Sequence, residues 1–182
     1  SNSSVQAFKR SGVTTPLYLL PHGVTLSSPS TAFDFLESIK MPKLLFFCAR
    51  EAFRKGLDLV ERLAQQQKEW FFIVKALPKE NQPAHITSDN ILLINLWLSS
   101  HDLASLYKNV DILLSPQRGG AFELNCIEAL AYGLPVAATR FGCVLDYLTD
   151  QNACLFNIET FSTTDNSNPH YGSWATADLN DA

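Results

Sequence analysis

Arg118-Gly-Gly-Ala-Phe-Glu-Leu-Asn-Cys-Ile-Glu-Ala-Leu-Ala-Tyr-Gly-Leu-Pro-Val136 is the stretch of sequence that decides the fold. It follows an apolar run at Asp111–Pro116, which is typical of a buried strand. A helical pattern extends from Phe122 to Tyr132, and Gly133 and Pro135 end it. The stretch therefore predicts a strand, a glycine loop and a helix, in that order.

The start of this helix is a predicted site for an anion or a hydroxyl group. Roughly four backbone N–H groups at a helix start have no helical partner, and the helix dipole places partial positive charge there. Gly119 and Gly120 allow a ligand to come close to the main chain. A phosphate or a sugar hydroxyl is a natural ligand, although many glycine-rich turns in α/β proteins bind nothing.

Glu128 lies inside the same helical pattern, among the apolar residues Leu124, Ile127 and Leu130. A carboxylate in that setting requires a partner, because burying it unpaired is costly. Glu128 is therefore a candidate for binding a ligand. The alternative is that it reaches the rim of the protein and contacts only water.

Length, composition and charge limit the classes of protein that fit this sequence. With 182 residues, of which 46% are hydrophobic and 18% charged, one domain with a sizeable core is expected. The net charge of −4, without a cluster of Lys and Arg, argues against nucleic acid as a partner. No apolar run approaches the length of a membrane span. No signal peptide is visible, although a removed leader is left open.

The four cysteines, Cys48, Cys126, Cys143 and Cys154, form no Cys-x-x-Cys pair. We interpret them as small buried hydrophobic residues of a protein in a reducing compartment, the cytoplasm. Their spacing argues against disulfides and against a zinc site. Because no Asp-x-Asp pair stands at a strand end and no histidine cluster is present, we expect no metal.

Further strands and helices alternate along the chain. Apolar runs predict strands at Pro16–Pro21, Lys43–Ala49, Trp70–Val74, Ile91–Leu96, Asp111–Pro116, Pro135–Ala138 and Ala153–Phe156. Helical patterns occur at Ser3–Gly12, Phe33–Ile39, Leu57–Gln67, Leu103–Asn109 with Ser100 or Asp102 as its cap, and around Asp146. The residues from Lys75 to Asn90 are expected to form a long polar connection.

This alternation, with strands that are continuously apolar, indicates a parallel sheet covered by helices on both faces. The predicted fold class is α/β, a doubly wound parallel sheet of the Rossmann-like, three-layer type. Ligands of such sheets bind beyond the carboxyl ends of the strands. The loops after Pro21, Ala49, Leu96, Pro116 and Ala138 are therefore expected to share one edge of the sheet.

We divide the chain at residue 158. Residues 1–158 form the expected Rossmann-like domain, and residues 159–182 a polar loop and an incomplete C-terminal segment. Thr160–Tyr171 is rich in Ser, Thr and Asn, and we expect it to be a loop or disordered. Ser173–Ala182 has the beginning of a helical pattern that is not completed.

Two cations, Arg50 and Lys55, lie on the predicted loop between a buried strand and the helix that follows it. Guanidinium and ammonium groups beside a glycine loop and a helix start suit a diphosphate. The alternative is that both charges are solvated, which is the usual state of Lys and Arg. Arg54, next to Lys55, is a rival for either role.

Three further residues are candidates for contacts with a ligand. His22 follows a predicted strand and precedes a glycine, so it either hydrogen-bonds a ligand hydroxyl or has a structural role. Glu123 stands in the first turn of the helix, where it either complements only the helix dipole or points into the site. Trp97 ends a predicted strand, and it either stacks on a flat base or belongs to the core.

Four blocks in order resemble the C-terminal half of GT-B glycosyltransferases, closest to family GT4, the group 1 glycosyltransferases. Each block alone is a weak signal, whereas the four in order are a strong one, and the resemblance runs from about Ser3 to Phe156. The blocks are Leu20–Val24, Arg50–Gly56 with the Leu-Asp-Leu after it, Leu103–Tyr107 with Asp111–Pro116, and Ile127–Thr139.

The resemblance implies that the domain binds a nucleotide-diphospho-sugar of the UDP or GDP type. Arg50 and Lys55 are then the catalytic residues, which hold the diphosphate and stabilise charge as it leaves. Glu128 accepts hydrogen bonds from the ribose hydroxyls, and backbone N–H groups around Gly120–Phe122 hold the sugar. Family members of this type usually retain the anomeric configuration and need no metal or other cofactor. The donor-binding residues that we predict are Gly119, Gly120, Ala121, Phe122, Glu123, Leu124, Glu128, Trp97 and His22.

The sequence departs from the family pattern in two places. The family has two glutamates separated by seven residues, and here Glu128 is the second but Gly120 stands at the first. Whether Glu123 substitutes for the first glutamate is left open. The N-terminal Rossmann domain, which binds the acceptor in the family, is absent, so we expect this chain to be inactive alone. Another part of the protein or a partner chain then supplies that half. A peripheral membrane association through the missing half is left open.

Two other classes of function remain alternatives, because a fold does not determine a function. One is a non-catalytic nucleotide- or sugar-binding module, which the glycine at position 120 favours. The other is a different GT-B enzyme, such as a sugar epimerase or a phosphorylase. The sequence does not identify the base, the donor sugar, the acceptor or the linkage.

Overall fold

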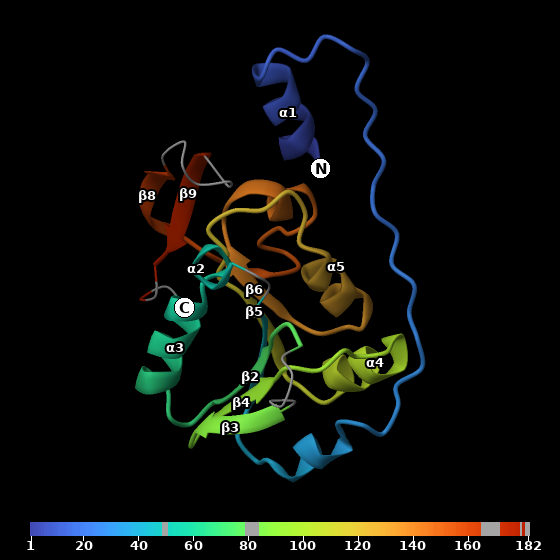
Figure 1. Cartoon of the computed structure of the whole chain (residues 1–182), viewed down its shortest axis with the longest axis vertical. Helices are drawn as coiled ribbons and strands as arrows, with labels where there is room; N and C mark the ends of the chain where they lie inside the picture. Colours follow the sequence, from blue (N-terminus) through green and yellow to red (C-terminus); the bar gives the residue numbers. More distant parts are fainter. Residues whose placement is uncertain (49–50, 79–83, 165–171, 179, 181–182) are drawn as a thin grey trace.

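A computed structural model describes residues 1–48, 51–78, 84–164, 172–178 and 180 (Figure 1). Its main feature is a seven-stranded sheet with the order β3-β4-β2-β1-β5-β6-β7. Adjacent strands are parallel except for β3, which pairs antiparallel with β4 at one edge. These seven strands are β1 Lys43–Phe47, β2 Phe71–Lys75, β3 Ala84–Ser88, β4 Ile91–Ile94, β5 Ile112–Ser115, β6 Val136–Thr139 and β7 Cys154–Phe156. The predicted α/β class with a mainly parallel sheet is confirmed.

Helices connect most of the strands. They are α1 Asn2–Arg10, η1 Asp34–Ser38, α2 Ala52–Lys55, α3 Leu57–Gln66, α4 Ser100–Lys108, α5 Leu124–Ala131 and η2 Gly142–Asp146, where η marks a 3-10 helix. The cap of α4 is Ser99, whose hydroxyl accepts a hydrogen bond from the Asp102 backbone N–H at 3.1 Å. The prediction of Ser100 or Asp102 as the cap was wrong, because the helix begins earlier than its apolar pattern.

The core consists of two layers, one on each face of the sheet. Because side chains alternate along a strand, Leu45 and Ile73 face a cluster that includes residues of α4 and α5. Phe46 and Val74 face the other cluster, against α3. Full burial of such a side chain contributes about 1.5–3 kcal/mol. Helices thus cover both faces, as the three-layer prediction requires (Figure 1).

The segment Pro16–Pro21 is not a strand, although its apolar residues predicted one. It belongs to an extended connection that runs past α5 and α4 along the outside of the domain (Figure 1). Tyr18 and Leu20 are 89% and 87% exposed. Prolines at both ends lack an N–H group for pairing with another strand, and no described strand pairs with the segment.

The C-terminal part of the chain also differs from the prediction. Strand β8, Ile158–Thr164, and strand β9, Gly172–Ala177, form an antiparallel pair, where we expected a loop and the start of a helix. Ala175 donates its backbone N–H to the carbonyl of Arg118 at 3.0 Å, so β9 is joined to the glycine loop. Threonine-rich sequence is compatible with a strand, and this tertiary contact explains why the pair forms here.

Two smaller predictions are corrected as well. The expected polar connection from Lys75 to Asn90 contains strand β3, and the expected basic loop after β1 contains the short helix α2. Of the cysteines, Cys154 is exposed, whereas the other three are buried as predicted. All four are free thiols. None of the described helices is long and apolar enough to span a membrane.

The junction between α2 and α3 brings Lys55 close to the end of β5. Gly56 links the two helices with a φ of +87°, a conformation that residues with a side chain rarely adopt. A Cβ atom at this position would lie 2.4 Å from the carbonyl oxygen of Pro116. Only glycine allows this approach, and it fixes α2 against the loop that follows β5.

Candidate functional site

A cleft of about 400 Å³ lies at the carboxyl ends of β1, β2 and β4, next to the start of α5. This is the edge of the sheet where the sequence predicts a ligand. The cleft is lined by Phe47, Cys48, Lys55, Lys75, Ala76, Leu77, Trp97, Leu98, Leu103, Phe122, Glu123, Leu124, Asn125 and Glu128.

Lys55 and Glu123 form an ion pair at this cleft. The Lys55 ammonium donates to both carboxylate oxygens of Glu123, with N–O distances of 2.7 and 2.6 Å. Their side chains are only 15% and 4% exposed. Lys55 is the last residue of α2, and Glu123 directly precedes α5. The pair thus joins the predicted basic segment to the predicted start of the helix.

Gly120 leaves the space that the Glu123 carboxylate fills. A Cβ atom at position 120 would lie 2.3 Å from Glu123 Oε1, far inside the contact distance. The amide of Gln117, in the orientation that satisfies its hydrogen bonds, donates to the same oxygen. The glycine loop therefore folds around the carboxylate of Glu123.

Glu128 is half-buried and faces the cleft from the middle of α5. Its Oε2 accepts a hydrogen bond from the Tyr107 hydroxyl of α4 at 2.9 Å. Burial raises the pKa of the Glu128 carboxyl above its usual value of 4.5, and the bond from Tyr107 opposes that shift. The carboxylate thus has the partner that its apolar surroundings require.

Lys75 is a second cation of the cleft that the sequence analysis did not identify. It is the last residue of β2, and its burial lowers the pKa of its ammonium below the usual value. The signal that could have identified Lys75 was its position at the end of a strand. Because β2 pairs with β1, the end of β2 lies beside the end of β1.

The comparisons with known proteins identify the family and the fold of this chain. The model of the family "Glycosyl transferases group 1" matches residues 42–164. This chain belongs to the group 1 glycosyl transferases. The family match covers the chain from β1 to β8, and therefore every residue that lines the cleft.

Relatives of this glycosyl transferase chain include two viral proteins. An uncharacterised protein of Sulfolobus islandicus rod-shaped virus 1 is 29% identical over 81% of this chain and 45% of its own length. A protein of a Sulfolobus islandicus filamentous virus, named as a putative glycosyltransferase, is 28% identical over 75% of this chain and 38% of its own length. The chain thus spans less than half the length of these relatives.

The fold of the group 1 chain is also found in solved structures. Sucrose-phosphate synthase from Thermosynechococcus elongatus superimposes with a TM-score of 0.71 and 17% identity. The match covers 88% of this chain and 44% of that enzyme. This likeness supports the GT-B assignment of the fold, which the Rossmann-like sheet also fits.

Most of the residues predicted to bind a donor in this glycosyl transferase chain lie together. Phe122, Glu123, Leu124, Glu128 and Trp97 line the cleft with Lys55. Trp97 is 83% exposed, so the alternative that it belongs to the core is wrong. It also lies beyond the end of β4, not at its last residue.

The remaining predicted donor-binding residues lie nearby but do not line the described cleft. Gly119, Gly120 and Ala121 form the loop at its side. His22 lies in the extended connection, with its ring 4.8 Å from the ring of Phe122. It lines a smaller adjoining cavity of about 150 Å³. Arg50, the other predicted catalytic residue, lies outside the described residues.

Arg54 and Arg118, the arginines that the structure describes in this region, contact the glycine loop and its neighbours and do not line the described cleft. Arg118 is buried, and its guanidinium binds both carboxylate oxygens of Asp58 at 2.7 Å. It also lies over the ring of Phe53 at 3.9 Å. Arg54 donates to the carbonyl of Gly119 at 2.7 Å and to Glu51 at 2.8 Å. Arg54 therefore has a structural partner on each side, which argues against it as a rival to Lys55.

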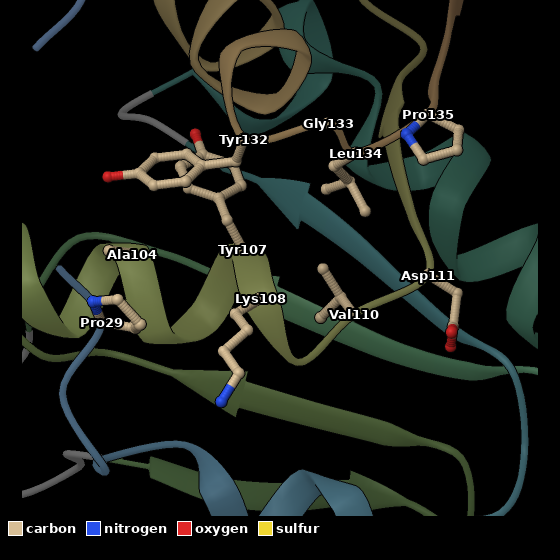
Figure 2. A pocket seen from close by; sticks show the side chains of 10 residues that line it. All are labelled: Pro29, Ala104, Tyr107, Lys108, Val110, Asp111, Tyr132, Gly133, Leu134 and Pro135. Carbon is tan, nitrogen blue, oxygen red and sulfur yellow. The ribbon is translucent and has the colours of Figure 1, made fainter. Parts of the chain in front are cut away.

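A second cavity, of about 410 Å³, lies at the opposite edge of the sheet (Figure 2). Its lining includes Val110 and Asp111, which precede β5, and Leu134 and Pro135, which precede β6. The rings of Tyr107 and Tyr132 are stacked, with centroids 5.3 Å apart, and they overlap in the view of Figure 2. In a parallel sheet this is the amino end of the strands, so it is the less favourable edge for a ligand.

Within the described residues, no group of three or more His, Cys, Asp or Glu side chains is arranged to hold a metal ion. Among the described residues that line the cleft, the charged groups are two ammonium groups and two carboxylates, those of Lys55, Lys75, Glu123 and Glu128. Such a set favours a ligand that carries both an anionic group and hydroxyls.

Proposed function

We propose that this chain is the donor-binding half of a glycosyltransferase that uses a nucleotide-diphospho-sugar. The observation that carries the proposal is that Lys55, Lys75 and Glu128 line one cleft at the carboxyl edge of the sheet. Ammonium groups suit the diphosphate, and a carboxylate that accepts hydrogen bonds suits the hydroxyls of the ribose.

Lys55 binds the diphosphate in this proposal and stabilises the negative charge of the leaving nucleotide. Its ammonium lies 2.6 Å from Oε2 of Glu123, the residue that precedes α5. The cation and the start of the helix therefore face the same space. Preorganised charge of this kind lowers the free energy of a transition state in which charge develops. Arg50 is proposed as its partner on the basis of the sequence resemblance.

Glu128 binds the ribose, with Tyr107 as its support. The Tyr107 hydroxyl occupies one oxygen of the carboxylate at 2.9 Å. The other oxygen, and the remaining lone pairs, accept the two ribose hydroxyls. The backbone N–H groups at residues 120–122 hold the sugar, and Trp97, which is exposed at the cleft, stacks on the base.

Transfer itself needs the acceptor-binding half, which another part of the protein or a partner chain supplies. The chain covers 44% of the structurally similar sucrose-phosphate synthase, which supports this division. Retention of the anomeric configuration, independence of metal and a cytoplasmic location are parts of the proposal. Proton NMR of the product formed by the completed enzyme, with and without EDTA, tests the first two.

Calorimetric titration with UDP- and GDP-sugars tests the binding proposal directly. We expect one of the two nucleotide types to bind to the wild-type chain, and Lys55→Ala to weaken that binding at least about tenfold, since hydrogen bonds to charged groups contribute about 1.5–3 kcal/mol. The control is Lys68→Ala, which removes an exposed lysine after α3. Absence of binding to every nucleotide-sugar, with Lys55→Ala behaving as the wild type, contradicts the proposal.

A second candidate function is a binding module without catalysis. It is supported by the ion pair with Glu123, which neutralises Lys55 in the free protein, and by the glycine at position 120. Supplying the acceptor-binding half of a related enzyme distinguishes the two. Transfer of sugar by the mixture supports the glycosyltransferase, and tight donor binding without transfer supports the module.

A further inference from the structure

Glu123 is held by three hydrogen-bonding partners. Lys55 contacts both carboxylate oxygens, at 2.7 and 2.6 Å, and the amide of Gln117 donates to one of them. The backbone carbonyl of Glu123 accepts a hydrogen bond from the Tyr147 hydroxyl at 2.8 Å. With its side chain 4% exposed, this carboxylate has one well-defined position.

Positions 120 and 123 compete for the same space beside Lys55. Because the Cβ of any residue at 120 would lie 2.3 Å from Glu123 Oε1, a side chain there requires the Glu123 carboxylate to move from its place beside Lys55. A side chain at position 120 would start beside the oxygen that contacts the ammonium, so either position could place a carboxylate near Lys55. In this chain residue 120 is glycine and residue 123 supplies the carboxylate.

The ammonium of Lys55 retains a donor for a ligand. An ammonium group has three N–H donors, and the hydrogen bonds described for Lys55 direct two of them to Glu123. The third is available to an oxygen in the cleft that Lys55 lines. Without the carboxylate, a lysine side chain of four flexible carbons would lose this orientation, and its partly buried charge would lack a partner.

We infer that Glu123 is the positioning residue of Lys55. It supplies the carboxylate that the sequence resemblance expects at position 120. Glu123 aims the free N–H of Lys55 at the diphosphate, and Gly120 is required because it leaves room for the carboxylate. This inference rests on the proposed function, since its ligand is the diphosphate of the nucleotide-sugar.

A thermal-unfolding cycle tests the pairing without any ligand. The variants are Lys55→Met, Glu123→Gln and the two together. We expect the melting temperature of the double variant to fall by less than the falls of the two single variants added together. The reason is that either single change leaves a buried charge unpaired, whereas the double change removes both charges. Additive shifts overturn the inference. The same cycle in the exchange background, Gly120→Glu with Glu123→Gly, is expected to recover a coupling with Lys55.

Titration with UDP- and GDP-sugars tests the positioning role. Glu123→Gln is expected to weaken binding at least tenfold, Gly120→Ala to weaken it because the added methyl displaces the carboxylate, and the exchange variant to recover most of the loss. A purely structural role would lower the melting temperature of Glu123→Gln and leave the affinity unchanged, which overturns the inference.

The outcomes separate the inference from the proposed function. If Glu123→Gln binds more tightly, the carboxylate only neutralises Lys55 and the inference is wrong, while the proposed function stands. If the wild-type chain binds no nucleotide-sugar, the proposed function fails, and with it the diphosphate as the ligand. The unfolding cycle then still decides whether residues 120 and 123 share one carboxylate position.

Discussion

The Tyr107 hydroxyl of α4 donates a hydrogen bond to Glu128 Oε2 of α5 at 2.9 Å. The same tyrosine lines the second cavity, and its ring stacks on that of Tyr132 (Figure 2). Tyr107 thus joins the cleft at one edge of the sheet to the cavity at the other, and it sets the position of the carboxylate that we assign to ribose binding.

Removing this hydroxyl is expected to weaken binding of the nucleotide. In Tyr107→Phe the carboxylate of Glu128 loses a bond that contributes about 0.5–1.5 kcal/mol, so affinity for the UDP- or GDP-sugar falls roughly two- to tenfold. Tyr132→Phe is the matched control, because its hydroxyl contacts Ser27 of the extended connection and not the cleft. Equal effects of the two variants in calorimetry would show that Tyr107 has no special relation to the ligand.

Binding is also expected to depend on pH through Glu128. Burial raises the pKa of this carboxyl above 4.5. Since the ionised form accepts the ribose hydroxyls, affinity is complete above the raised pKa and is lost as the pH falls through it. The transition therefore lies at a higher pH than for an ordinary glutamate. Titrations from pH 7 to pH 4 measure it, and Glu128→Gln should abolish this part of the pH dependence. A transition that persists unchanged in Glu128→Gln belongs to another group.

Gly56, at the α2–α3 junction, is expected to tolerate a side chain less well than Gly133 does. Gly56→Ala adds a Cβ atom 2.4 Å from the Pro116 carbonyl, as well as the cost of a positive φ. Gly133→Ala has the same kind of φ, +75°, but meets nothing within 4 Å. We expect a loss of about 1–2 kcal/mol of unfolding free energy for Gly133→Ala, and a clearly larger loss for Gly56→Ala. Urea unfolding measures both, and similar losses would remove the steric argument.

Much of the sheet could be predicted because its strands are buried on both faces. Residues 44–47 of β1, for example, are continuously apolar, and burial against helices on both faces explains that pattern. The same criterion failed at Pro16–Pro21, since an apolar run becomes a strand only when a neighbouring strand accepts it. The prediction for the β8–β9 segment failed in the opposite way, because its mostly polar sequence did not indicate strands. A backbone hydrogen bond to Arg118 stabilises the pair.

The candidate site was predictable where local sequence determines it. Lys55 and Glu128 were identified from a basic segment near a strand end and from an acid in an apolar helix, and both line the cleft. The partners of these residues were not predictable. The contacts of Glu123 with Lys55 and of Tyr107 with Glu128 depend on how α2, α4 and α5 pack. These partners are 68 and 21 positions apart in the sequence, so no local signal indicates the contacts.

The pair between Arg118 and Asp58 is expected to stabilise the glycine loop. Arg118 is 3% exposed, so Asp58→Asn leaves a buried guanidinium without its carboxylate, at a cost of about 1.5–3 kcal/mol. Asp150→Asn breaks the exposed pair with Arg140, which contributes less than about 1 kcal/mol. Urea unfolding of the two variants compares them directly. A loss in Asp58→Asn no greater than in Asp150→Asn would show that the buried geometry adds nothing.

The most direct test of the central claim is a crystal structure of this chain soaked with the nucleotide-sugar that calorimetry selects. We predict a phosphoryl oxygen within hydrogen-bonding distance of Lys55 Nζ, ribose hydroxyls on Glu128, and Glu123 still paired with Lys55. A nucleotide in the cavity of Figure 2, or in the cleft with its diphosphate remote from Lys55, would contradict the account.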